Sequence, residues 1–421
     1  MPMGRGGQSR VAHSTMPSGR FFCRTPAGDD RSHPREMFDG ELQRERGRGR
    51  QTFRRAGASH TGAASIQKSC NKLCPLGTRK IRQVMKTFLT IRQILQNTTN
   101  ASKLLVMTPP TQAQLVGPLL KAVSRSFYLT LRVLPAPIRP QISLAYLLAR
   151  ATDTIADTDA VPRAKRIVLL RELQNLTRVP ELGVLAENQT LPAERVLLER
   201  LEECLAMLNT FDTRDRRLIQ QLLNTIITGQ IFDLETFPGN LRAIADEATL
   251  DRYTYLVAGC VGEFWTEMCQ AHLPGLERLS IADGIRFGKG LQLVNILRDM
   301  PRDYAIGRCY LPVQNPLDHS EVLPVFTKWL DVAVEHLDAG WQYTLTIPAN
   351  QKRLRLACVW PLWIGLKTIA RLRQANPLDA AQCVKVSRME VYSIMAQSVL
   401  RAGSAASLNK IYQQLRTAAL G

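Results

Sequence analysis

The chain has 421 residues, a formal net charge of +19 and an isoelectric point of about 9.9. Most of the excess charge lies in the first quarter: residues 1–106 carry 20 Lys and Arg against 6 Asp and Glu, whereas residues 107–421 carry 35 against 30. Because no run of 18 or more apolar residues occurs, the sequence predicts no membrane-spanning helix. The nine cysteines follow no signal-peptide pattern, which favours reduced thiols inside a cell.

Residues 1–106 are predicted to form a basic, disordered extension, because their first sixty residues are rich in Arg, Gly, Ser and Pro and poor in apolar side chains. A misassigned start codon, a transit segment and an RNA-binding arm are the alternatives, and the last is the least favoured. Within the extension, residues 80–106 have the pattern of a short basic amphipathic helix that could lie on a membrane surface.

Residues 107–421 are predicted to form one all-α domain, because apolar residues recur at spacings of three and four and no β-alternation is present. One helix is expected to begin near Pro140, which suits the first turn, and to run to the first acidic pair described below. Further helices are expected at about 163–177, 192–209, 213–235, 250–270, 280–299, 323–342, 350–373 and 378–416.

Two acidic pairs at i,i+4 spacing are the most informative feature, because residues four apart lie on one face of a helix. The first pair is Asp153 and Asp157, and the second is Asp299 and Asp303. Each pair continues a polar stripe along its helix; the stripes are Tyr146, Arg150, Asp153 and Asp157, and then Gly288, Gln292, Asn295 and Asp299. A solvated helix face with local ion pairs, such as Asp153 with Arg150, is the alternative to a binding site.

The two pairs together predict a site for Mg²⁺ and a diphosphate. Carboxylate oxygens are ligands that Mg²⁺ prefers, and its remaining positions are commonly filled by water and substrate phosphates. Arginines beside each pair can add charge-assisted bonds to phosphate oxygens. Once a diphosphate leaves an allylic carbon, an apolar pocket with aromatic faces must protect the cation from water.

A stretch rich in small residues, at 258–262, lies on a predicted helix that also carries Tyr253. Glycine within a helix costs roughly 1 kcal/mol relative to alanine, so two glycines there indicate close approach of a ligand or of another helix. Both interpretations are left open by the sequence.

Residues from about 115 to 372 resemble the squalene/phytoene synthase family. The matching motifs occur in the family's order: SRSF at 124–127, RATDTIAD at 150–157, YTYLVAGCVG at 253–262, LQLVNILRD at 291–299 and GRCYLP at 307–312. The resemblance implies the single-domain, all-α isoprenoid-synthase fold with a central active-site cavity. It also implies the head-to-head joining of two prenyl diphosphates.

By the same resemblance, Asp153, Asp157, Asp299 and Asp303 would be both Mg²⁺ ligands and catalytic residues. Tyr253 matches a tyrosine with an acid/base role. The implied substrate contacts are Arg125, Phe127, Arg150, Gln292, Asn295, Arg298 and Arg308.

The first motif resembles that of squalene synthases, and the sequence is most like a bacterial squalene synthase. The expected reaction joins two farnesyl diphosphates through presqualene diphosphate to squalene, with Mg²⁺ and with reduction by NADPH. NADPH follows from the resemblance alone, since Gly288-Lys-Gly290 is no dinucleotide fingerprint. Phytoene or dehydrosqualene synthesis without reduction is one alternative. A non-catalytic assembly factor is another, which the retained Asp residues and Tyr253 argue against.

The second motif departs from the family, because Arg302 replaces an acid and Pro301 lies between the two Asp residues. Proline is expected to bend or end the helix there, which would displace Asp303. Ala156 likewise replaces the usual acid of the first motif. We further expect a cytoplasmic monomer that binds no nucleic acid, with peripheral membrane contact for an apolar product left open.

Overall fold

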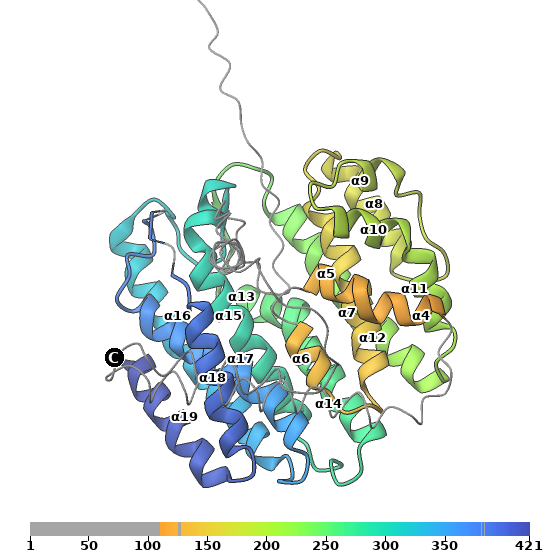
Figure 1. Cartoon of the computed structure of the whole chain (residues 1–421). Helices are drawn as coiled ribbons and strands as arrows, with labels where there is room; N and C mark the ends of the chain where they lie inside the picture. Colours follow the sequence, from red (N-terminus) through yellow and green to blue (C-terminus); the bar gives the residue numbers. More distant parts are fainter. Residues whose placement is uncertain (1–109, 125–127, 380, 383) are drawn as a thin grey trace, which may run out of the picture. The chain divides into compact units, whose positions relative to one another are not determined.

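The structure is a computed structural model that describes residues 110–124, 128–379, 381–382 and 384–421. The predictions for residues 1–106 therefore lie outside the described part of the chain. Within it, the regular structure is almost entirely helical, which confirms the all-α class (Figure 1).

The described helices and strands fall into two groups along the chain. The first group is α4 (Pro110–Gln114), the π-helix η3 (Leu115–Leu119), α5 (Leu120–Ser124), α6 (Tyr128–Val133), α7 (Arg139–Asp157), α8 (Arg163–Leu173), α9 (Gly183–Glu187), α10 (Pro192–Glu199), α11 (Leu201–Leu208) and α12 (Thr213–Thr236). The second group is β1 (Arg242–Ala243), α13 (Glu247–Thr254), the π-helix η5 (Tyr255–Gly259), α14 (Cys260–His272), α15 (Ile281–Ala305), β2 (Arg308–Cys309), α16 (His319–Thr346), α17 (Lys352–Leu372), α18 (Arg388–Arg401) and α19 (Ala405–Leu420).

Several helix boundaries differ from the predicted ones. The segment predicted at 192–209 is two helices, α10 and α11, that meet at Arg200. The segment predicted at 378–416 is also divided, because Ser387 and Ser404 cap separate helices, α18 and α19. A serine cap gives the first backbone N–H groups of each helix a partner, and so it favours a new start over continuation.

Pro301 was expected to bend or end its helix, and it does not end it. Helix α15 continues through Pro301 to Ala305, and Met300 before the proline and Asp303 two residues after it are buried. A proline within a helix costs one backbone hydrogen bond, and the packing on both sides offsets that cost. Asp303 therefore stays one helical turn after Asp299.

The two helices that carry the acidic pairs, α7 and α15, are connected through other helices. Helix α7 packs against α12, and α12 in turn packs against η5 and α14, which pack against α15. Figure 1 shows α12 beside α7, with α15 next to α13. Helix α12 thus connects α7 to the elements that pack on α15.

The glycine-rich stretch at 258–262 packs against α15. A Cβ atom added to Gly262 would lie 1.9 Å from the carbonyl oxygen of Gly284, and one added to Gly288 would lie 2.2 Å from that of Ala258. Close helix packing, one of the two interpretations left open by the sequence, therefore accounts for these small residues.

The only strands in the described residues are β1 and β2, which pair in parallel with Arg242 opposite Arg308 and Ala243 opposite Cys309. No alternation in the sequence predicted them, because each strand has only two residues. Gly307 precedes β2 with a φ of 81°, and a Cβ atom there would lie 2.4 Å from the carbonyl oxygen of Gly239. The turn into β2 therefore requires glycine.

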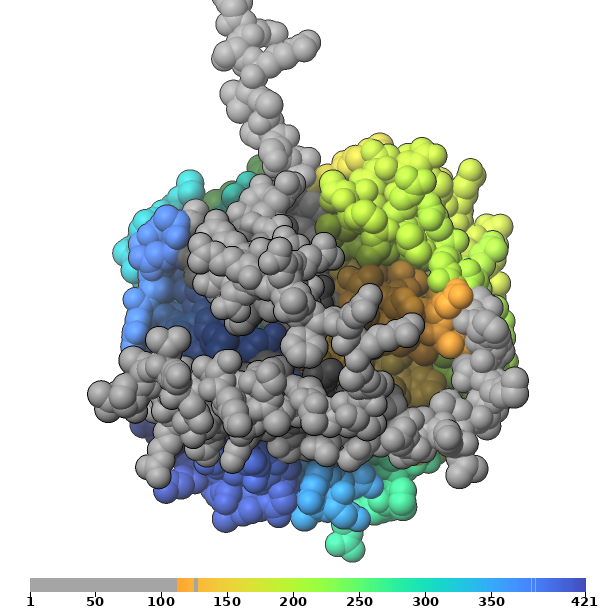
Figure 2. Space-filling view, in the orientation of Figure 1, coloured from red at the N-terminus to blue at the C-terminus, as the bar shows by residue number. Residues whose placement is uncertain are grey.

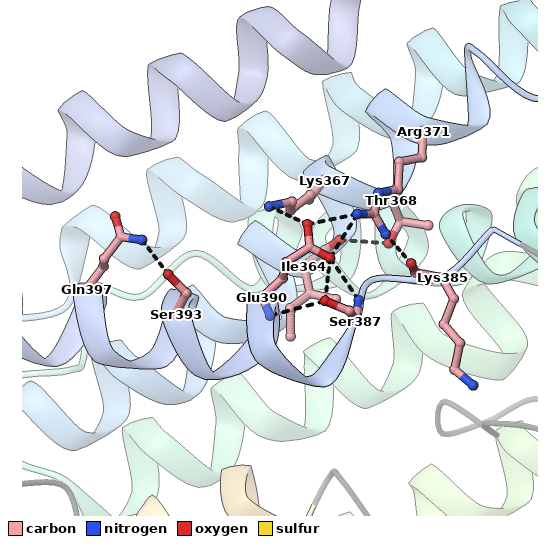
Figure 3. Close-up of polar contacts among 9 residues, drawn as sticks. All are labelled: Ile364, Lys367, Thr368, Arg371, Lys385, Ser387, Glu390, Ser393 and Gln397. Atoms are coloured by element: carbon pink, nitrogen blue, oxygen red, sulfur yellow. Dashed lines mark hydrogen bonds and ion pairs between the residues drawn. The ribbon is translucent and has the colours of Figure 1, made fainter. Parts of the chain in front are cut away.

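Helix α18 is anchored to α17 through Glu390, as Figure 3 shows. The Glu390 carboxylate is 2.9 Å from Lys367 Nζ and accepts two hydrogen bonds of 2.8 Å from Arg371. It also forms a capping box with Ser387. The hydrogen bonds from Lys367 and Ser387 lower the pKa of Glu390 below its usual range.

In the space-filling view, residues of α8 to α11 and residues of α16 to α19 form opposite sides of the face that is shown (Figure 2). Among the described helices, none combines the length and the apolar character that crossing a membrane would require.

Candidate active site

The polar stripe of α7 is buried. Tyr146, Arg150, Asp153 and Asp157 are each 8% exposed or less. Arg150 Nη1 donates a 2.5 Å hydrogen bond to Asp153 Oδ2, so the local ion pair proposed as the alternative does form. It forms away from solvent, however, and the interpretation of this stripe as a solvated face is wrong. Burying charged groups in an apolar helix layer is costly unless partners or ligands are present.

Glu194 is a second partner of Arg150, and it was not predicted from the sequence. It lies in the first turn of α10, is buried, and accepts a hydrogen bond from Arg150 Nη2. Burial by itself lowers the pKa of Arg150, but the carboxylates of Asp153 and Glu194 outweigh this and hold it above its ordinary value. The one available signal was that Glu194 shares a helix face with Leu197 and Leu198.

Substituting Glu194 with Gln should weaken the hydrogen bonds that hold the Arg150 side chain in place, and Arg150 in turn holds Asp153. Gln keeps the size of the side chain but removes one of the two charges that compensate the buried guanidinium. We expect the free energy of unfolding to fall by about 2 kcal/mol. The matched control is Glu199→Gln in the same helix, where a surface pair of 2.7 Å with Arg195 contributes little. Urea unfolding of both variants measures this, and equal effects would contradict the role of Glu194.

Arg166, on α8, extends the charged cluster at the end of α7. It is buried and donates to the carbonyl oxygen of Ala156 at 2.6 Å and to Asp159 at 3.1 Å. Burial lowers the pKa of Arg166, and the charge of Arg308 adds to this, while Asp159 and Asp157 oppose it. Arg166 therefore has both Asp157 and Arg308 as electrostatic neighbours, although the three residues come from separate elements.

On α15, the carboxylate of Asp299 is hydrogen-bonded to the side chain of the preceding residue, Arg298. Arg298 donates two hydrogen bonds to the Asp299 carboxylate, at 2.8 and 2.6 Å, and the Asp299 side chain is 30% exposed. Gln292, two turns earlier, is buried, and its Nε2 has no hydrogen-bond partner among the described residues. A buried donor without a partner is costly, which favours a ligand at this point.

Asp303 lies near the segment that follows α15. Burial raises the pKa of the Cys309 thiol, and the Asp303 carboxylate adds to the rise. Asp303 is thus an electrostatic neighbour of Cys309, which adjoins the predicted diphosphate contact Arg308. Arg308 is in turn an electrostatic neighbour of Arg166, as Asp157 is.

Tyr253 lies in an aromatic cluster. Its ring stacks on Tyr310 with centroids 5.0 Å apart, and it lies 5.7 Å from Phe232. Tyr310 also contacts Phe237, edge to face, at 4.8 Å. Tyr253 lies in the last turn of α13, directly before the π-helix η5. π-Helical turns occur often at functional sites. Of this cluster, Tyr253 was predicted from the sequence and its ring neighbours were not.

Two predicted substrate contacts, Arg125 and Phe127, lie outside the described residues. Ser124 of the same motif is described and buried at the end of α5. Asn295 lies on the predicted stripe of α15 and is partly buried.

One cluster that was not predicted from the sequence joins Asp212, Asp215 and His272, with ligand atoms within 4.8 Å of one another. Asp212 caps α12 by accepting from the backbone N–H of Asp215, and the Asp215 carboxylate bonds both Gln141 and His272. These contacts explain the cluster as a link between helix ends.

The fold and the site define an all-helical protein in which buried carboxylates on α7 and α10 surround the buried guanidinium group of Arg150. Residues 120–390 match the family described as squalene/phytoene synthase, which is more than half of the chain. The chain therefore belongs to the squalene/phytoene synthase family, a family of prenyltransferases, as its five ordered motifs predicted.

Individual relatives agree with this assignment. The chain is 34% identical over 195 residues to the presqualene diphosphate synthase of Rhodopseudomonas palustris, a match that covers 45% of this chain and 59% of the relative. It is 23% identical over 295 residues to the squalene synthase of Cyberlindnera jadinii, covering 66% of each. The chain thus spans less than two thirds of the length of either relative.

A solved complex of TcSQS with the ligand BPH1237 has a similar fold. Its TM-score is 0.58 at 20% identity, and the match covers 73% of this chain and 97% of that one. At this identity the likeness concerns the fold alone, and it agrees with the isoprenoid-synthase fold that the motifs implied.

Proposed function

We propose that this chain joins two farnesyl diphosphates head to head and converts them, through presqualene diphosphate, to squalene. The observation that carries the proposal is the buried stripe of α7, in which Asp153 and Asp157 share a face with Arg150. Such a concentration of buried charge is expected where a charged ligand completes the site. Membership of the family supplies the reaction class.

The donor set fits Mg²⁺, which Asp153, Asp157, Asp299 and Asp303 would hold. When bound, Mg²⁺ would stabilise the negative charge of the departing diphosphate. Arg150, Arg298 and Arg308, together with Arg125, would bind the diphosphate oxygens through charge-assisted hydrogen bonds. Gln292 and Asn295 would add polar contacts along the same face of α15.

The aromatic cluster around Tyr253 could stabilise the carbocation that forms during the condensation. In the first step the C1–O bond of one farnesyl diphosphate breaks and the electron pair leaves with the diphosphate. The allylic cation adds to the double bond of the second substrate, and loss of a proton closes the cyclopropane ring. We assign the handling of that proton to the Tyr253 hydroxyl, while the stacked rings exclude water and face the cation.

NADPH would supply the hydride of the final reduction. We assign no residues to it, because Gly288 lies in the packed contact between α15 and Ala258 and offers no phosphate-binding loop. The reduction therefore stands on the family resemblance.

A second candidate is a reaction that stops at presqualene diphosphate. The observation in its favour is that the presqualene diphosphate synthase of Rhodopseudomonas palustris is more nearly identical to this chain than the squalene synthase of Cyberlindnera jadinii. Phytoene or dehydrosqualene formation without reduction remains the third outcome.

The deciding experiment incubates the full chain with Mg²⁺ and either farnesyl or geranylgeranyl diphosphate, with and without NADPH, and identifies the products by mass spectrometry. Squalene that forms only with NADPH supports the first proposal. Presqualene diphosphate under both conditions supports the second, and phytoene or dehydrosqualene supports the third. Absence of diphosphate release from either substrate would contradict all three.

Replacing Tyr253 with Phe should lower kcat about 100-fold and leave KM nearly unchanged, since the ring stack stays and only the hydroxyl is lost. The control is Tyr255→Phe, two residues further on, which removes a hydroxyl that donates a 2.8 Å hydrogen bond to Glu263. Steady-state kinetics on both variants test the role. A rise in KM alone for Tyr253→Phe would rule out acid/base action.

We also propose that the protein acts as a cytoplasmic monomer that touches a membrane surface to deliver its apolar product. Sedimentation with phospholipid vesicles tests the membrane contact, and light scattering without vesicles tests the monomeric state. Recovery of all protein in the supernatant, or a dimer mass, would contradict them.

A further inference from the structure

We propose that Asp233 is a positioning residue that couples the diphosphate contact Arg308 to the acid/base residue Tyr253. This inference rests on the proposed function, because it takes the roles of Arg308 and Tyr253 from there. Nothing in the sequence motifs drew attention to Asp233, which lies near the end of α12.

The two oxygens of the Asp233 carboxylate hold two different partners. Oδ2 accepts a 2.6 Å hydrogen bond from Arg308 Nη1, and Oδ1 accepts the hydroxyl proton of Tyr310. All three side chains are largely buried, with Asp233 and Arg308 about one tenth exposed. Hydrogen bonds to a buried charged group are among the strongest in proteins, so one carboxylate fixes both partners.

The local backbone explains why both partners reach the same carboxylate. Arg308 begins the short strand β2, and residues two apart along an extended chain point to the same side. Arg308 and Tyr310 therefore face α12 together, while Cys309 between them contacts Tyr304 through its sulfur atom. The pairing of β1 with β2 holds the segment in this position, with Ile244 N–H donating to the Cys309 carbonyl at 3.1 Å.

The position of the Tyr310 ring affects the position of Tyr253, because the two rings are in contact. The two rings stack with an interplanar angle of 26°, and Phe232, the residue before Asp233, packs on Tyr253 from α12. The hydrogen bond from Tyr310 to Asp233 restrains the tilt of the ring that stacks on Tyr253, and its loss removes that restraint. A displacement of about 1 Å of a reacting group can cost about 100-fold in rate.

Asp233 also compensates charge where two guanidinium groups approach. Arg308 is an electrostatic neighbour of the buried Arg166. Removing the carboxylate would leave more positive charge facing the substrate, so the binding of a diphosphate should not weaken. Turnover should fall, because Arg308 and Tyr253 lose their orientation. The expected signature is thus a lower kcat with an unchanged KM, which a general loss of structure would not produce.

The test uses Asp233→Asn, Tyr310→Phe and the double variant in the full chain. Asp233→Asn should lower kcat about 100-fold, with KM for farnesyl diphosphate within about threefold of wild type. The double variant should be no slower than the slower single variant, because both changes act on the same hydrogen bond between Tyr310 and Asp233. The control is Glu235→Gln on the same helix, whose side chain is 54% exposed and pairs with Arg171 at 3.3 Å; it should keep wild-type turnover.

Two further measurements separate this inference from the proposed function. Calorimetry with Mg²⁺ and inorganic diphosphate should give the same affinity for Asp233→Asn and wild type. Melting temperatures of the two single variants and the double variant should be non-additive, which reports the Asp233–Tyr310 bond without any turnover. If wild type releases no diphosphate from prenyl substrates, the proposed function fails while the bond is still tested.

Three results would overturn the proposal. They are a kcat of Asp233→Asn within threefold of wild type, independent and multiplicative losses of kcat in the double variant, and additive shifts of the melting temperature. A proportional rise in KM with a lowered melting temperature would show that Asp233 is only structural.

Discussion

Replacing Asp153 with Asn should lower the release of diphosphate from farnesyl diphosphate about 1,000-fold while the chain still folds. The substitution keeps the size of the side chain but removes a carboxylate from the proposed Mg²⁺ site, where charge stabilisation of the leaving group is the main contribution to the rate. Asp299→Asn should have an effect of the same order. Initial rates of diphosphate release measure both.

The fold should survive because Arg150 has two acidic partners. When Asp153 is changed, Glu194 still compensates the buried guanidinium, so the free energy of unfolding should fall by only about 1–3 kcal/mol. The control is Asp331→Asn, which removes the carboxylate of an Asp–Arg pair whose Asp side chain is 53% exposed, on α16. Wild-type turnover in Asp153→Asn would refute the metal-site interpretation, and an unfolded variant would refute the compensating role of Glu194.

Replacing Gly262 with Ala should strongly lower the free energy of unfolding. The new Cβ would lie 1.9 Å from the Gly284 carbonyl oxygen, which is backbone and cannot rotate away, so α14 and α15 must separate. We expect a loss of about 3 kcal/mol in the free energy of unfolding. Turnover should fall as well, because α15 carries Asp299 and Asp303.

Gly183→Ala in α9 is the matched control, since a Cβ there would meet no atom within 4 Å. Alanine favours helix over glycine by roughly 1 kcal/mol, so this variant should be neutral or slightly stabilised. Urea unfolding followed by circular dichroism compares the two. Equal free energies of unfolding for the two variants would show that α14 and α15 can move apart without loss of stability.

Part of the candidate site could be predicted because its information lies within one helix. Arg150, Asp153 and Asp157 share a face as a consequence of helical periodicity, and their burial follows from the apolar residues around them. The start of α7 near Pro140 was predicted for a similar local reason. In contrast, the local preference of Pro301 to end a helix does not decide the outcome, because α15 continues through Pro301 with buried residues before and after it.

The sequence by itself therefore determined the helical class, the family and the phase of each acidic stripe, since all of these depend on residues close together in the chain. Only the tertiary structure decided which distant side chains complete the site. Glu194 lies 44 residues from Arg150, and Asp233 lies 75 residues from Arg308. Such pairs depend on how α10 packs on α7 and on how the segment after α15 turns back to α12. Spacing along a sequence carries no information about those contacts, because they are set by the packing of whole helices.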